Sequence, residues 1–160
     1  MSRYDTILVP TAFSKLSKLA APWVVPLAKQ FQSKVHVVHV VPHTELAIPT
    51  GTPSLGGAMG VPLTGPSRDE LMQMSRRHLE EFTAGVLSDI RDQLTTWTTI
   101  GPIVDEIVGY AERHKVDLII MGTHADGMLK RLVFGSIGKS VLEAAPCPVL
   151  LVPVRGAKTT

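Results

Sequence analysis

The chain has 160 residues, of which 44% are hydrophobic and 19% charged, a composition typical of a globular domain rather than a disordered chain. The net charge is +2, with both signs interspersed, and only 5% of residues are aromatic, so no nucleic-acid partner is predicted. The single cysteine, Cys147, excludes an intrachain disulfide framework and a multi-cysteine zinc site, and no apolar run is long enough to cross a membrane. We therefore expect a cytoplasmic domain with no membrane partner.

The first third of the chain predicts a strand, a helix and a second strand. Residues 4–10 and 35–41 are short β-branched apolar runs, as buried strands are. Between them, Ser14 is a suitable N-cap for a helix that reaches Gln32, with Pro22 expected to bend it or delay its start. One apolar face recurs at spacings of three or four along this helix: Leu16, Ala20, Trp23, Leu27 and Phe31.

Residues 42–66 hold five prolines and five glycines, with Glu45 as their only charged residue. Such a segment is expected to form a long surface loop after the second strand. Long loops inside compact domains are either mobile or functional, so a mobile loop and a lid or partner surface both remain open.

Three further helices alternate with three further strands. Ser67 and Glu70 have the spacing of a capping box, and they open a helix expected to run to about Leu94. Its predicted inward side chains are Leu71, Met74, His78, Leu79, Phe82 and Val86. Strands are then predicted over 95–100, 116–121 and 147–154, and helices over 102–114 and 136–145. The inward residues of these two helices are Ile103, Ile107, Tyr110, Ala111, Ile137, Val141 and Leu142.

Strands that alternate with helices predict an α/β fold, an open parallel sheet with helices on both faces and right-handed crossovers. The predicted elements form one domain over residues 1–155, followed by a short tail over 156–160.

Ligands of such sheets bind at the carboxyl ends of the strands, where the strand order reverses. The segments 10–14 and 122–136 follow the first and fourth strands. Gly135, Ser136, Ile137 and Gly138 offer unhindered amides at a helix start, so they form either a phosphate cradle or an ordinary turn and N-cap. The tripeptide Gly138-Lys139-Ser140 is not a Walker A motif, because Val133 stands where that motif needs glycine.

The segments ILVPTAFS, Gly122 to Gly135-Ser136, and APCPVLLVPV together resemble the universal stress protein family over nearly the whole chain. The resemblance implies a five-stranded sheet in the order 3-2-1-4-5, of the adenine nucleotide alpha hydrolase-like type. It also implies a homodimer in which the fifth strands pair antiparallel through Val149, Leu150, Leu151, Val152, Pro153 and Val154. An apolar terminal edge strand independently favours a partner there.

Many members of this family bind ATP, with Mg, through glycines separated by two and then nine residues, the last followed by Ser or Thr. Gly122, Gly135 and Ser136 match this pattern, but Ala125 replaces the middle glycine and Ala12 replaces a common aspartate. The site implied by the resemblance comprises Pro10, Thr11, Ala12, Val40, Met121, Gly122, Ala125, Gly135, Ser136, Ile137 and Gly138. If position 125 required a positive φ, Ala125 would cost about 1 kcal/mol relative to glycine.

No metal site and no catalytic constellation are predicted. His36 and His39 are three apart on a strand and therefore face opposite sides of the sheet, and Cys147 has no neighbouring base. His124, Lys130 and Arg131 could contact a ligand, but exposed loop side chains are the better interpretation. We therefore expect a regulatory or protective stress protein with weakened ATP binding, at most a slow ATP hydrolase or autophosphorylating protein. The alternative is a nucleotide-free dimeric interaction module.

Overall fold

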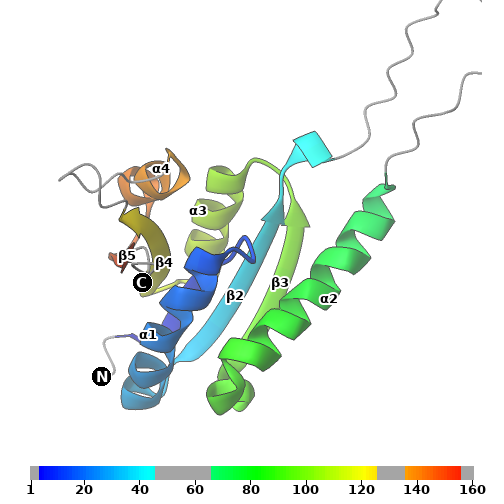
Figure 1. Ribbon diagram of the computed structural model, residues 1–160. Helices are drawn as coiled ribbons and strands as arrows, with labels where there is room; N and C mark the ends of the chain where they lie inside the picture. The colour runs from blue at the N-terminus through cyan, green and yellow to red at the C-terminus, as the bar shows by residue number, and fades with distance from the viewer. Residues whose placement is uncertain (1–3, 46–65, 126–135, 156–160) are drawn as a thin grey trace, which may run out of the picture.

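Five short segments, rich in β-branched residues, form the strands of one parallel sheet in the computed structural model, which describes residues 4–45, 66–125 and 136–155 (Figure 1). The strand order is β3-β2-β1-β4-β5, as expected, and each neighbouring pair is parallel. The direction of winding reverses between β1 and β4, so the switch point lies there. The strands are β1 (Thr6–Pro10), β2 (Lys34–Val41), β3 (Leu94–Ile100), β4 (Leu118–Ala125) and β5 (Val149–Arg155).

Helices cover both faces of the sheet and divide its core into two layers. The larger apolar cluster packs α1 (Lys15–Phe31) and α2 (Arg68–Val86) against one face. The other joins the opposite face to α3 (Ile103–Arg113) and α4 (Ser136–Ala144). Alternate residues of β1 and β4 serve the two layers, which is why these central strands are apolar along most of their length, whereas β3 at the edge of the sheet carries four threonines.

The caps explain where two helices begin. Ser14 caps α1 by accepting a hydrogen bond from the Ser17 amide, and α1 starts at Lys15, so Pro22 does not delay it. Ser67 and Glu70 form the predicted capping box of α2. That helix ends earlier than expected, at Val86, and the following residues form the 3-10 helix η2 (Ser88–Gln93).

Several side chains predicted to face inward are exposed. On α1, Trp23 is 58% exposed, and the buried face is made of Ala20, Ala21, Val24 and Ala28, which are small enough to bring the helix close to the sheet. Met74, His78, Ile137 and Leu142 are also exposed. An apolar residue at helical spacing therefore marks the buried face only to within one neighbouring position.

The fourth strand extends beyond its predicted end at Met121. Its pairing with β5 continues from Ile119 opposite Val149 to Ala125 opposite Arg155. Gly122 and Ala125 are thus strand residues rather than loop residues. Of the proposed 42–66 loop, residues 43–45 form a short 3-10 helix, η1 (His43–Glu45). Its remainder up to residue 65 lies outside the described residues, as do the tail over 156–160 and Gly135.

Candidate functional site

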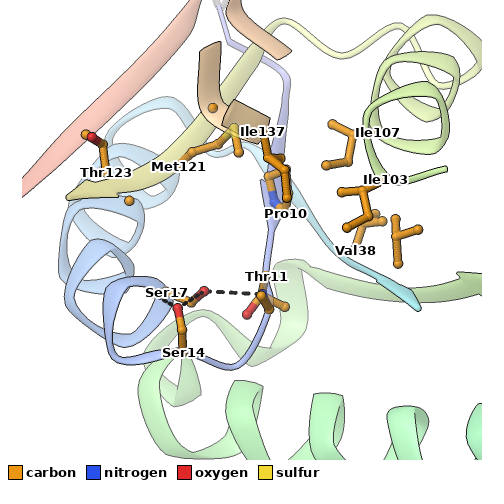
Figure 2. A pocket seen from close by; sticks show the side chains of 14 residues that line it. Pro10, Thr11, Ser14, Ser17, Val38, Ile103, Ile107, Met121, Thr123 and Ile137 are labelled. Atoms are coloured by element: carbon orange, nitrogen blue, oxygen red, sulfur yellow. Dashed lines mark hydrogen bonds between the residues drawn. The ribbon is translucent and has the colours of Figure 1, made fainter. Parts of the chain in front are cut away.

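A cavity of about 210 Å³ opens at the carboxyl ends of β1 and β4, at the switch point of the sheet (Figure 2). This is where doubly wound sheets hold their ligands. Its described lining consists of Pro10, Thr11, Ala12, Ser14, Ser17, Val38, Val40, Ile103, Ile107, Met121, Gly122, Thr123, Ile137 and Gly138.

The walls of the cavity are apolar. In Figure 2, Val38 of β2 lies near Ile103 and Ile107 of α3 on one side, while Met121 of β4 and Ile137 of α4 lie on another. Because Ile103 and Ile107 are four residues apart on α3, their side chains lie next to each other on the same face of that helix. These walls suit a flat, weakly polar ring rather than a strongly hydrated group.

Hydroxyl groups lie at the rim between β1 and α1. Ser17 Oγ accepts a hydrogen bond from the Ala12 amide at 3.3 Å and lies 3.5 Å from Ser14 Oγ. Thr11 Oγ1 accepts one from the Phe13 amide at 3.1 Å. None of the described lining side chains is ionisable, so the polar contacts available there come from hydroxyls and backbone groups.

The β1–α1 turn is held by two residues outside the described lining of the cavity, Phe13 and His39. Phe13 has a φ of 58°, a left-handed conformation that is strained for a side-chain-bearing residue. The centroid of its ring lies 4.2 Å from the ring centroid of His39, whose Nδ1 donates a hydrogen bond to the Thr11 carbonyl at 2.8 Å. Burial lowers the pKa of His39, which keeps the ring neutral near pH 7. These contacts fix the backbone of Thr11 and Ala12 at the rim.

The structure brings together eight of the eleven residues that the sequence assigned to a nucleotide site. They are Pro10, Thr11, Ala12, Val40, Met121, Gly122, Ile137 and Gly138. Ser136 starts α4 and is exposed, but it is not part of the described lining. Ala125 ends β4 in an extended strand, so the penalty expected for a positive φ there does not apply.

Six lining residues were not among the eleven: Ser14, Ser17, Val38, Ile103, Ile107 and Thr123, although Ser14 and Thr123 lie in the segments 10–14 and 122–136. Two of them had a usable signal. Ser17 follows the N-cap Ser14 by three residues, which places both hydroxyls at the same end of α1. The contribution of α3 depends on how the crossover returns over the sheet, which no local pattern in the sequence shows.

The histidines do not form a shared site. His36 Nδ1 is 3.0 Å from the Tyr110 hydroxyl on the α3 side, whereas His39 faces Phe13 on the other side, as predicted. Within the described part of the chain no group of three or more metal-ligating side chains occurs. Burial raises the pKa of the Cys147 thiol, which keeps it protonated and unreactive. The side chains of His124, Lys130 and Arg131 lie outside what the structure describes.

A parallel sheet with this strand order and helices on both faces defines the class of doubly wound α/β domains. The sequence model of the universal stress protein family matches residues 3–153, and the chain belongs to that family. No helix among the described residues is both long enough and apolar enough to span a membrane.

Relatives match over nearly the full length. The universal stress protein MJ0531 of Methanocaldococcus jannaschii is 30% identical over 150 residues, which cover 93% of this chain and 82% of the relative. The structure of protein MJ0577 from the same organism superimposes with a TM-score of 0.71 at 25% identity, covering 97% of this chain and 99% of the other. The structure of a universal stress protein from Archaeoglobus fulgidus in complex with dAMP shares the fold, with a TM-score of 0.60 and 19% identity. The match covers 94% of this chain and 98% of the other.

Proposed function

We propose that the cavity at the ends of β1 and β4 binds an adenine nucleotide and that the protein acts as a regulatory or protective stress protein in the cytoplasm. The observation that carries this proposal is the apolar cavity at the switch point, framed by most of the residues that the family pattern assigns to nucleotide binding. The dAMP complex of the Archaeoglobus relative supports the same class of ligand.

The dimensions suggest how a nucleotide would lie. At about 210 Å³, the cavity is smaller than the roughly 300–1,000 Å³ of pockets that enclose a whole small-molecule ligand. The base would enter between Val38, Ile103 and Met121, and the ribose would meet the hydroxyls of Ser14 and Ser17. The phosphates, with Mg when the ligand is ATP, would extend towards the start of α4, where free amides and the helix dipole favour anions.

Binding is expected to be weak because of Ala12. A carboxylate at this position would accept charged hydrogen bonds from the ribose, each worth about 1.5–3 kcal/mol. Its loss corresponds to about one to two decades in affinity. Ala125 adds no further conformational cost because it is a strand residue. The neutral lining offers no general acid or base among its described side chains, which favours a binding role over efficient hydrolysis.

Calorimetry with Mg-ATP and with adenosine tests this proposal. The variant Ile137→Glu places a carboxylate in the first turn of α4, where a negative charge stabilises the helix but repels phosphate. It should weaken Mg-ATP binding at least tenfold and adenosine binding less. Leu142→Glu is the matched control, because Leu142 is exposed on the same helix outside the cavity. Absence of heat with both ligands at millimolar concentration would contradict the proposal.

That negative result would favour the second candidate, a nucleotide-free interaction module. The observation in its favour is the missing carboxylate at Ala12 together with the absence of any charge in the described lining. In both cases we propose that the protein forms a homodimer through the outer edge of β5. Leu150 is 37% exposed on this strand, and β5 pairs only with β4 in the described sheet.

A further inference from the structure

The opposite edge of the sheet is formed by β3, which pairs only with β2 among the described strands. Its seven residues, LTTWTTI, include no charge and no proline, and Thr95, Thr96 and Trp97 are exposed. Proteins usually protect an edge strand with lysine, proline or a bulge, because its free amides and carbonyls can pair with another chain. This edge has neither the charge nor the proline.

The residue order of β3 is symmetric about its centre. Two threonines precede Trp97 and two follow it, flanked by Leu94 and Ile100. The same strand read in reverse presents nearly the same side chains. An antiparallel pair of two such strands, related by a two-fold axis at Trp97, therefore places like side chains together.

The main chain of β3 is in the right phase for this pairing. The Gly101 amide donates to the Val41 carbonyl, so odd-numbered residues of β3 direct their backbone groups towards β2. Thr96 and Thr98 consequently direct their N–H and C=O groups outward. In the symmetric register, Thr96 lies opposite Thr98 of the partner subunit, and the two residues exchange both hydrogen bonds.

We propose that β3 pairs antiparallel with β3 of a second copy of this chain, with Trp97 at the two-fold axis. The two Trp97 residues then form a non-hydrogen-bonded pair, in which cross-strand side chains come closest. Trp97 is 47% exposed in the single chain, and its ring centroid lies 6.0 Å from that of Tyr110. In the pair, the Trp97 ring of each copy would cover much of the exposed ring surface of the other through an aromatic contact.

An unpaired hydroxyl supports this register. Thr98 is only 9% exposed, and its Oγ1 is buried without a hydrogen-bond partner. Thr98 is one of the residues that line a cavity of about 430 Å³ between β3 and α2. Buried hydroxyls are normally satisfied, so a lone one marks a missing partner. In the proposed pair, Thr96 of the partner subunit lies directly opposite on the same face, a position from which threonine hydroxyls bond to each other.

The α2 helices of the two copies would lie next to each other across the axis, on the same face of the joined sheet. Leu71 packs on Ile100, and Trp97 is three residues, or about 10 Å, further back along β3. At 1.5 Å per residue, that level is reached roughly 6–7 residues after Leu71. The axis thus passes near position 78, midway between Arg76 and Glu80.

This placement makes the helix surfaces complementary. Arg76 and Glu80 both line the cavity beside β3, and neither forms an ion pair with another described residue. The two-fold axis brings Arg76 towards Glu80 of the partner subunit and the reverse, giving two equivalent cation–carboxylate contacts. A second copy therefore matches this edge in three respects: the outward backbone groups of β3, the symmetric side chains of β3, and the opposite charges on α2.

The β3 edge is also better supplied with donors than the β5 edge. The Ile119 amide donates to the Pro148 carbonyl, so the alternation along β5 directs Pro153 outward. Proline has no N–H, and a β5 pair therefore lacks a hydrogen bond from this residue. The β3 pairing depends neither on β5 nor on nucleotide binding. If both edges pair, the assembly extends beyond two subunits.

Native mass spectrometry and light scattering at tens of micromolar protein test the proposal. Trp97→Lys puts two like charges at the axis, and Trp23→Lys is the matched control, since Trp23 is an exposed tryptophan on α1. We expect Trp97→Lys to lose a β3 partner, giving a lower mass than the wild type and the control. Equal masses for Trp97→Lys, the control and the wild type, or a monomeric wild type, would overturn the proposal.

A charge exchange on α2 provides a second test that leaves β3 unchanged. Arg76→Glu and Glu80→Arg should each weaken association at least fivefold, because each places like charges opposite one another. The double variant restores opposite charges and should recover the wild-type mass. If all three variants associate as the wild type does, the register is wrong. Leu150→Lys, which alters the β5 edge, should leave the β3 pair intact and so separates failure of this proposal from failure of β5 pairing.

Discussion

Ala12 lies exposed at the rim of the cavity, and its amide donates to Ser17 Oγ. The hydroxyls of Ser14 and Ser17 offer a ribose neutral hydrogen bonds there, each of which contributes about 1 kcal/mol rather than the larger amount of a charged one. In the proposed complex, the chemistry of this rim would therefore determine the affinity, and the apolar walls would determine which ring enters.

Ala12→Asp should strengthen the binding of adenosine about 10- to 100-fold, because the new carboxylate accepts charged hydrogen bonds from the ribose hydroxyls. Titration calorimetry of wild type and variant measures the change. Ala84→Asp, on the exposed side of α2 and outside the cavity, should leave the affinity as in the wild type. An unchanged affinity for Ala12→Asp would show that the ribose does not lie at this rim.

Two histidines should make stability depend on pH. Burial is the main reason that the pKa values of His36 and His39 lie below 6.5, with positive neighbours such as His114 and Lys34 adding to the effect at His36. The unfolded chain then takes up protons before the folded one does. The contribution of the two neutral histidines to the free energy of unfolding is complete above pH 6.5. It is lost as the pH falls through their lower pKa values in the folded protein.

Urea unfolding at pH 7.5 and pH 5 measures this dependence. The wild type should lose stability on acidification, and the double variant His36→Gln/His39→Gln should lose less, since glutamine does not titrate. His43→Gln is the control, because His43 is exposed on η1. A double variant that loses as much stability as the wild type would place the acid sensitivity in other groups.

Single residues also show where sequence reasoning reached its limit. The switch-point argument predicted the segments 10–14 and 122–136, whereas the wall residues Val40 and Met121 came only from the resemblance to the universal stress protein family. Ile103 and Ile107 were correctly expected to face inward, but their place in the cavity depends on how α3 returns over the sheet. The strand was expected to end at Met121 but reaches Ala125, because the length of β4 depends on its partner, β5.

Among the elements, α1 combines a buried apolar face with two prolines in its interior. Pro22 and Pro26 both lie inside the helix, and each removes one hydrogen bond to the preceding turn. Burial of Ala20, Ala21, Val24 and Ala28 against the sheet offsets this cost. The helix therefore persists because of tertiary packing, which explains why a local propensity argument expected a bend or a later start.

Pro22→Ala should stabilise the fold by about 1–3 kcal/mol, because it restores an amide donor and removes a clash inside the helix. Pro22 is exposed, so the change leaves the core untouched. Pro102→Ala is the matched control: Pro102 is the exposed N-cap of α3, where proline blocks no helical hydrogen bond. Urea denaturation compares the two. Equal stabilisation by both variants would mean that Pro22 carries no special cost.

The strand order and the two helical layers follow from the alternation of strands and helices, and the sequence predicted both. Element ends were less predictable, because they depend on partners distant in the chain. The α2 helix stops at Val86, and Leu87 and Ile90 of the following turn are buried in the core.

At the scale of the whole molecule, the cavity and the two sheet edges use different parts of the fold. The described lining comes from β1, the β1–α1 turn, α1, β2, α3, β4 and α4, and includes no residue of β3 or β5. Assembly through either proposed edge would therefore leave the cavity walls unchanged. Nucleotide binding and assembly should be independent, with no coupling free energy between them.

The double variant Trp97→Lys/Leu150→Lys tests this independence, because it alters both edges at exposed positions. Its affinity for adenosine should match that of the wild type within twofold. In a thermal unfolding assay, a ligand at ten times its Kd should stabilise both proteins by about 1.4 kcal/mol, since the gain depends only on occupancy of the native cavity. A tenfold loss of affinity in the variant would instead mean that a neighbouring subunit completes the site, and the cavity would then have to be placed at an interface.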